Sequence, residues 1–145
     1  MGGTVQSRSN TRGGAVVRMK RSPLRRVSKK TAAENRKIAP LRKAYKAEFE
    51  LCMLCNKKLS TDVHEIARGT YRAQAKLKPS CWLTLCRGCH SAMDDYSAWP
   101  ITRQLALKLI VDPGRFYLAE VNEVRGRAID AISLAEVVQH LDLKE

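Results

Sequence analysis

Residues 52–90 of the chain read CMLCNKKLSTDVHEIARGTYRAQAKLKPSCWLTLCRGCH. A Cys-x-x-Cys pair stands at each end of this stretch, Cys52 with Cys55 and Cys86 with Cys89. Four thiolates carried on two such turns are the usual ligands of a tetrahedral structural zinc ion. Thirty residues separate the pairs, more than the roughly 15 to 20 of a plain zinc ribbon, so the ion is expected to close a larger insert.

The cysteines also indicate a compartment. The chain has five of them, without a signal-peptide pattern and without an apolar stretch long enough to span a bilayer. We therefore expect a reducing cytoplasm, in which clustered thiols bind metal rather than form disulfides. The fifth cysteine, Cys81, lies between Ser80 and Trp82 and is expected to pack as a small apolar residue.

The net charge of +13 is concentrated at one end of the chain. Residues 1–50 hold 14 Lys and Arg against 3 acids, whereas residues 101–145 hold 6 against 7. Crowded cations gain most by displacing counterions from a polyanion, which makes nucleic acid the expected partner. A solubility tail is the alternative. No membrane binding is expected, because the residues before 31 lack the apolar stripe that an interfacial helix needs.

Composition then divides the N-terminal third into two parts. Residues 1–30 have little to bury and are expected to form a disordered basic arm. Residues 31–50 are expected to form two basic helices, the first opened by a Thr31-x-x-Glu34 capping box and the second beginning at Pro40. The second helix should pack through an apolar face and turn its cations elsewhere. The apolar residues are Leu41, Tyr45 and Phe49, and the cations are Arg42, Lys43 and Lys46.

Residues 51–98 form the expected zinc-stapled core, in which residues 61–66 and 82–85 predict two short paired strands and a helix begins near Cys89. Residues 99–145 predict a helical extension. One helix should run from Ile101 to the Asp112-Pro113-Gly114 stop, and a last one should open at a Ser133-x-x-Glu136 capping box. The expected fold class is a small, mostly helical α+β domain, whose C-terminal helices are candidates for binding a protein partner or a second copy.

This order of residues resembles the zinc-stapled HNH endonucleases of phages and prophages. The resemblance covers residues 52 to about 95, and the lead-in from Arg21 to Arg26 is similar too. It rests on the two cysteine pairs, on Asp62-Val63-His64-Glu65-Ile66 and on Leu83-x-Leu85 before Cys86-x-x-Cys89-His90. It implies a treble-clef-like ββα-metal fold in a bacterial or phage-infected cytoplasm. In that fold two strands and a helix hold one catalytic divalent cation, Mg²⁺, Mn²⁺ or Ni²⁺, at a scissile DNA phosphate.

The resemblance also assigns roles to residues. His64 falls on the position of a metal ligand and Glu65 on that of the catalytic base. Imidazole is the better base at neutral pH, so the two roles can be exchanged. Because neighbouring strand residues point to opposite faces, the exchange is possible only if the strand is bent or bulged. His90 matches the last ligand position, and Asp94, one helical turn later, is a further candidate ligand or a partner of His90. Cys81 stands where the family has an asparagine that fixes loop geometry, so that geometry is not expected to carry over.

Each of these residues has a plainer interpretation. His64 can be a structural strand histidine, His90 a zinc ligand in place of a cysteine, and Asp94 a solvated helix residue. Two other functions therefore stay open, a non-catalytic DNA-binding zinc protein on a decayed HNH fold and a zinc-stapled assembly or regulatory protein. The cations expected to hold DNA phosphates without reading sequence are Arg21, Arg25, Arg26, Arg68, Arg72, Lys76 and Lys78.

Deletion of residues 1–30 removes nine Lys and Arg and no acid. DNA affinity should fall and its salt dependence should flatten, since each neutralised phosphate contributes about 0.9 to the slope of log affinity against log salt. Fluorescence anisotropy between about 50 and 200 mM salt measures this slope. A slope equal to that of the full chain would show that the arm does not touch DNA.

Overall fold

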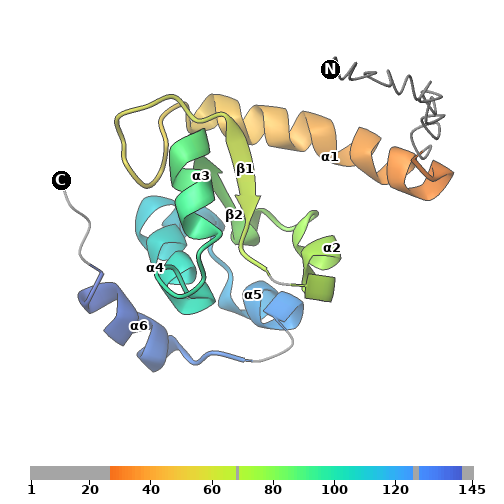
Figure 1. Ribbon diagram of the computed structural model, residues 1–145. Coiled ribbons are helices and arrows are strands. Elements are labelled where there is room, and N and C mark those ends of the chain that lie inside the picture. The colour runs from red at the N-terminus through yellow and green to blue at the C-terminus, as the bar shows by residue number, and fades with distance from the viewer. Residues whose placement is uncertain (1–26, 68, 126–127, 142–145) are drawn as a thin grey trace, which may run out of the picture.

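The computed structural model describes residues 27–67, 69–125 and 128–141, so most of the basic arm lies outside the described residues (Figure 1). The described part is a small, mostly helical α+β unit with one two-stranded sheet. Its elements are α1 (Lys29–Glu48), β1 (Asp62–Glu65), η1 (Gly69–Tyr71), α2 (Arg72–Ala75), η2 (Pro79–Cys81), β2 (Trp82–Leu85), α3 (Arg87–Met93), α4 (Ile101–Val111), η3 (Pro113–Arg115), α5 (Leu118–Arg125) and α6 (Ala131–Gln139).

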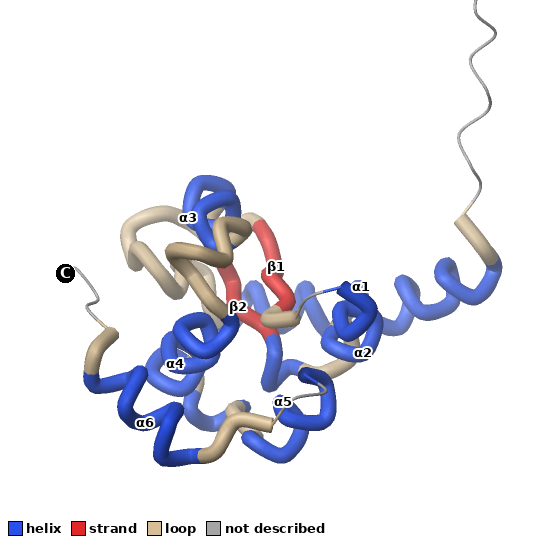
Figure 2. The backbone as a smooth tube through the Cα atoms, turned by 60° about the horizontal axis from the view of Figure 1, so that its bottom comes forward, coloured by secondary structure: helices blue, strands red, loops and turns tan. Residues whose placement is uncertain are grey.

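The sheet confirms the two strands predicted from the sequence. β1 and β2 run antiparallel, with His64 opposite Leu83 and Glu65 opposite Trp82. All four residues of β2 are buried. Helix α3 packs against both strands and α1 against β1, and the sheet lies among these helices and α4 (Figure 2). The basic segment between the strands folds into η1, α2 and η2, and α2 packs beside α5.

Helix α1 differs from the two helices expected. It begins at Lys29, where the Ser28 hydroxyl caps it by accepting from the Thr31 amide N–H at 3.1 Å, so Thr31 is not the cap. It also continues through Pro40. A proline inside a helix costs roughly 3 kcal/mol. Packing offsets this cost here, since Ile38 and Tyr45 are buried on either side of Pro40.

The packed face of α1 is also turned from the expected one. Leu41 is 51% exposed, whereas Arg42 lies over the Trp82 ring and forms an ion pair with Glu65. At about 100° per residue, Leu41 and Arg42 lie about 50° to opposite sides of the line through Ile38 and Tyr45, and the Arg42 side faces the sheet. The helix therefore presents a cation, not a leucine, to the sheet.

Beneath α1, a buried polar group joins three elements. The Lys108 ammonium on α4 lies 2.5 Å from the Asp112 carboxylate and 2.6 Å from the Tyr45 hydroxyl. The Tyr45 hydroxyl in turn lies 2.8 Å from the Asp112 carboxylate, to which it donates its one proton, and 3.1 Å from the Trp82 carbonyl. Because Lys108 is fully buried, its charge depends on these partners, which fix α4 against α1 and β2.

The C-terminal helices close the core. Helix α4 spans the residues predicted for it, and α6 packs across it through Leu134. The cap of α6 is Asp130, whose carboxylate accepts from the Ser133 amide N–H at 2.8 Å, so the expected Ser133 cap is wrong by three residues. Within the described ranges, no helix is both long and apolar enough to cross a membrane.

Candidate metal centres

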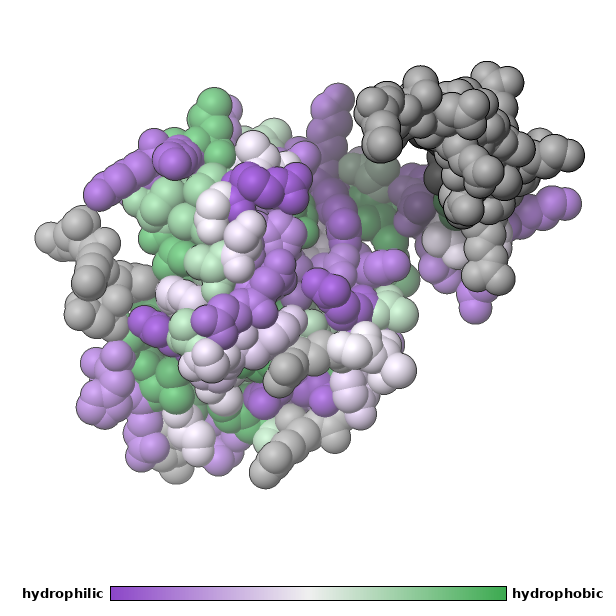
Figure 3. All heavy atoms as spheres, viewed as in Figure 1, coloured by the Kyte–Doolittle hydropathy of each residue, from purple (hydrophilic) through white to green (hydrophobic). Residues whose placement is uncertain are grey.

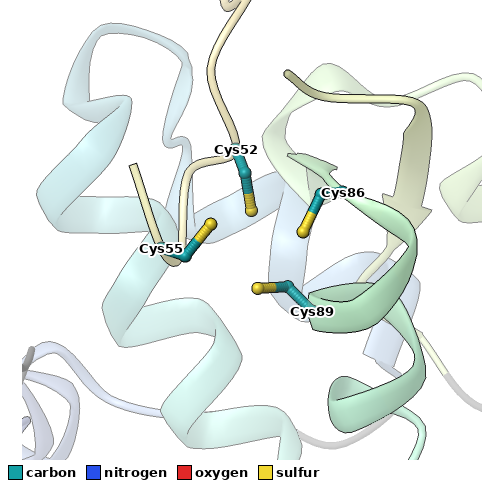
Figure 4. A group of neighbouring side chains, drawn as sticks. All are labelled: Cys52, Cys55, Cys86 and Cys89. Atoms are coloured by element: carbon teal, nitrogen blue, oxygen red, sulfur yellow. The ribbon is translucent and has the colours of Figure 1, made fainter. Parts of the chain in front are cut away.

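The four cysteines of the two Cys-x-x-Cys pairs converge on one point (Figure 4). Their sulfur atoms all lie within 4.8 Å of one another. Cys52 and Cys86 are buried, and Cys55 and Cys89 are half-buried. Four thiol groups at this spacing match the ligand set of a tetrahedral structural ion such as zinc, so the cluster fits the metal that the spacing predicts.

Local backbone geometry builds the first cysteine turn. The Asn56 amide N–H donates to the Cys52 carbonyl at 2.8 Å, and Asn56 itself is left-handed with φ of 50°. Asparagine tolerates this conformation better than most residues. The Met53 amide N–H then donates to the Thr84 carbonyl at 2.9 Å, which fastens this turn to β2. The second pair opens α3, where the His90 amide N–H donates to the Cys86 carbonyl at 2.9 Å.

Backbone amides also prepare two of the thiols for metal. The N–H groups of Lys57 and Lys58 donate to the Cys55 sulfur and lower its pKa to about 6 against the opposing effect of burial. The Cys89 amide lowers the pKa of Cys86 in the same way. Burial raises the pKa of Cys89. A bound cation stabilises all four thiolates, because it supplies the charge that the surroundings lack.

A second group of possible ligands lies on the same strand–helix unit. His64 from β1, His90 from α3 and Asp94 at the end of α3 each offer an atom within 4.8 Å of the other two. The two imidazole rings are 5.1 Å apart and inclined at 76°. His64 is 1% exposed, His90 is half-buried and Asp94 is exposed, so the group opens to solvent on the Asp94 side. The structure thus brings together the three residues predicted to hold a catalytic metal.

Gln104 on α4 fixes which nitrogen of His64 is free. The Gln104 amide nitrogen donates to the carbonyls of Trp99, at 2.8 Å, and Met93, at 3.3 Å, so its oxygen must face the other way. That oxygen is 2.8 Å from Nε2 of His64, which must therefore carry the proton. Burial lowers the pKa of His64 and keeps the ring neutral, so Nδ1 bears a lone pair.

Nδ1 of His64 is buried and has no hydrogen-bond partner. A buried polar atom without a partner costs roughly 1–3 kcal/mol, so a plain core histidine would be expected to satisfy it. A ring nitrogen held bare by a hydrogen bond at the opposite nitrogen is the arrangement of a metal ligand. The Asp62 carboxylate lies 3.4 Å from Nδ1 of His90, which leaves Nε2 of His90 available to a metal.

Glu65 does not join this group. It follows His64 on an unbulged strand, so its side chain points to the opposite face, where it pairs with Arg42. The exchange of roles between His64 and Glu65 required a bent or bulged strand, which the register of β1 does not contain. The ligand group therefore includes His64 without Glu65, and the role of Glu65 as base stays a prediction.

Cys81 is buried in the core, and the described cations predicted to bind DNA differ in exposure. Cys81 is fully buried, as expected, and burial raises the pKa of its thiol to about 11. Its backbone carbonyl, rather than an asparagine side chain, accepts the Ile66 amide N–H at 2.7 Å and closes the loop between the strands. Arg72 is exposed, Lys76 is half-buried and Lys78 pairs with Glu123 at 2.5 Å. Arg21, Arg25, Arg26 and Arg68 lie outside the described residues.

Sequence reasoning missed Gln104 and Asp62 as supporting residues. Gln104 directly precedes the apolar run Leu105–Leu107 of α4 and is itself fully buried. A glutamine on the packed face of a predicted helix was the available signal, because buried amides need partners. Comparison of the chain with models of protein families, with curated proteins and with solved structures finds no match.

Loss of a cysteine ligand should release the structural metal and weaken the fold. In small zinc units the free energy of metal binding is largely folding free energy. Cys52→Ser and Cys89→Ser should each lower zinc content below one ion per chain and broaden or abolish the thermal transition. Cys81→Ser is the matched control for zinc, since Cys81 is outside the cluster. Stoichiometric zinc in a Cys52→Ser/Cys86→Ser double variant would refute the site.

Gln104→Leu should weaken metal binding at the second group while leaving the cysteine site filled. Loss of a residue that orients a ligand typically costs about 10- to 100-fold in metal affinity. Calorimetric titration of the zinc-loaded protein with Mn²⁺ or Co²⁺ measures this change, and Gln139→Leu, at an exposed glutamine of α6, is the control. An affinity equal to wild type would mean that Gln104 does not position His64.

Proposed function

We propose that this chain is a metal-dependent DNA endonuclease of the HNH type, in which a structural zinc ion supports a separate catalytic cation. The observation that carries the proposal is the convergence of His64, His90 and Asp94 beside, but not within, the four-cysteine cluster. A zinc-binding module without catalysis needs only the cysteines. It gives no reason for a second group of ligand atoms, one of them a buried bare nitrogen.

The arrangement of elements supports the same proposal. Two antiparallel strands and the following helix α3 form a ββα unit, and the two histidines face each other from the first strand and the helix. The cysteine pairs stand at the entry to this unit and at the start of α3. Alternative use of His90 as a zinc ligand has less support, because four cysteines already complete a tetrahedral set without it.

The residues of the site suit hydrolysis of a phosphodiester. A divalent cation held there would stabilise the charge that develops on the phosphate and on the leaving oxygen. His64 and His90 would contribute nitrogen ligands, oriented by Gln104 and Asp62, and Asp94 would contribute a hard oxygen on the solvent side. Glu65 can act as the base only where Arg42 releases it, and a phosphate bound by Arg42 would provide that exchange.

The basic face of α1 supports DNA as the substrate. Between Lys29 and Glu48 the helix carries seven cations against two acids, and hydrophilic side chains gather along it (Figure 3). The exposed cations are Lys29, Lys30, Arg36, Lys37 and Lys43. They continue the charge of the arm toward β1. Such a row holds phosphates without reading sequence.

A non-catalytic DNA-binding protein is the second candidate, favoured by the same cations and by the pairing of Glu65 with Arg42. The third, an assembly protein that binds through its C-terminal helices, has less support. The apolar face of α6 is already used inside the protein, because Leu134 is buried where α6 packs on α4.

Nicking of supercoiled plasmid in Mg²⁺, Mn²⁺ or Ni²⁺, with a metal-free control, tests the proposal. His90→Ala and His64→Ala should each lower the cleavage rate by roughly 100-fold or more, and more metal should restore part of it if both are ligands. Asp94→Asn should weaken metal affinity, whereas Asp95→Asn, which removes the next carboxylate along the chain, should not. Inactivity of the zinc-loaded wild type on linear, supercoiled and branched DNA would favour the binding-protein candidate.

Glu65→Gln separates the base from the ligands. Because the Glu65 side chain lies on the other face of β1, this variant should bind the second metal as wild type does by calorimetry. A fall in cleavage of about 10²- to 10⁴-fold at unchanged metal affinity is expected if Glu65 is the base. Wild-type cleavage by Glu65→Gln would remove Glu65 from the mechanism.

A further inference from the structure

A cavity of about 490 Å³ opens beside the second ligand group, on the side of α4 and α5. Its walls come from the segments that follow the proposed ligands. Ala67 lies three residues after His64, and Tyr96 lies two residues after Asp94. The chain spans at most about 3.6 Å per residue, so these walls lie within roughly 7 to 11 Å of the ligand backbones. Pro100, Ile101 and Thr102, at the start of the helix that carries Gln104, form a third wall.

The lining has the chemistry of a site for a nucleobase. Tyr71 and Tyr96 bring two aromatic rings, Thr70 and Thr102 bring hydroxyl groups that can donate and accept, and Arg125 brings a cation. Among the residues that the structure describes, no acidic residue lines this cavity. Tyr71 is 39% exposed, so its ring is accessible. Aromatic rings at the mouth of a positively charged groove are the platforms on which unpaired bases stack.

We propose that this cavity binds the base of one unpaired nucleotide next to the scissile phosphate, so that the enzyme acts on DNA with single-stranded character. The inference rests on the proposed nuclease function and narrows its substrate. A base in a duplex is stacked on both faces, so it cannot enter a cavity without leaving the helix, which costs a few kcal/mol. A single strand, a flap or a branched end offers such a base at less cost.

The size of the cavity suits this occupant. At about 490 Å³ it lies within the usual range for sites of small ligands, about 300 to 1,000 Å³. One base with its sugar can enter, whereas a duplex cannot. The phosphates on either side of that nucleotide would then lie toward the ligand group and toward Arg72, the exposed cation at the start of α2. The cavity thus contributes selection for DNA structure, whereas α1 contributes only charge.

A double-mutant cycle between protein and DNA tests the proposal. A labelled single strand of about 12 nucleotides, matched to the site sizes of single-strand binders, is prepared with one abasic position moved along its length. Affinities for the zinc-loaded full chain are measured by anisotropy without added divalent metal. One abasic position should weaken binding by roughly 5- to 100-fold, the usual range for one stacked base. In Tyr71→Ala the same abasic position should cost nothing further.

Matched variants complete the design. Tyr71→Phe keeps the ring and should bind as wild type, and Tyr117→Ala, which removes an exposed tyrosine outside the cavity, should too. Duplex affinity should change less than about twofold in Tyr71→Ala, since duplex binding is carried by phosphate contacts. The abasic scan of the wild type needs no variant, so it remains decisive if Tyr71→Ala fails to fold.

Two results would overturn the proposal. One is a scan in which no abasic position matters, and the other is an abasic effect of the same size in Tyr71→Ala and wild type. Both are measured without cleavage, so an inactive nuclease leaves the test intact. If the protein nicks DNA but the effects of the abasic position and of Tyr71→Ala are additive, the base-binding role of the cavity is rejected and the nuclease proposal stands.

Discussion

Closure of the four-cysteine cluster is the constraint on which the rest of the structure depends. The sheet has only four residues in each strand, and a two-stranded sheet of this size is marginal in water. A metal that joins Cys52 and Cys55 to Cys86 and Cys89 fixes both ends of the insert at one point. Zinc contributes roughly 10–16 kcal/mol to the folding of small zinc units, more than so short a sheet can contribute. The residues of the insert are therefore available for the candidate site.

That site is assembled from both sides of the sheet unit. The cysteine cluster brings α3 against β1, so that His90 faces His64, and the Lys108–Asp112–Tyr45 group sets the position of α4 behind them. Gln104 lies one turn before Lys108 on the same helix. The buried ion pair and the buried amide thus act on one element. The Lys108–Asp112 ion pair fixes the position of α4, and from that position the Gln104 amide orients the His64 imidazole.

The sequence predicted well what depends on local pattern. The Cys-x-x-Cys spacing, the two strands and helix α4 all follow from residues close together in the chain. The two misplaced helix caps are local choices between neighbouring polar residues, Ser28 or Thr31 and Asp130 or Ser133. The other departures come from packing at long range. Pro40 stays helical because Ile38 and Tyr45 are buried on either side of it. Arg42, rather than Leu41, lies on the packed face because it pairs with Glu65 and lies over the Trp82 ring. The supporting role of Gln104 depends on the fold of residues 93–104, which no local motif specifies.

The position of Gln104 also bears on where this module begins and ends. The motif residues stop near residue 95. The helices after them could be taken for a C-terminal extension that is replaceable without effect on the motif. They are not independent of the motif, because the amide that selects the tautomer of His64 belongs to α4. A transplanted segment from Cys52 to Asp94 would carry its own zinc staple and its ligands, yet its buried histidine would be free to protonate on either nitrogen. The segment that can be transplanted with its site intact therefore includes α4 and is longer than the recognisable motif.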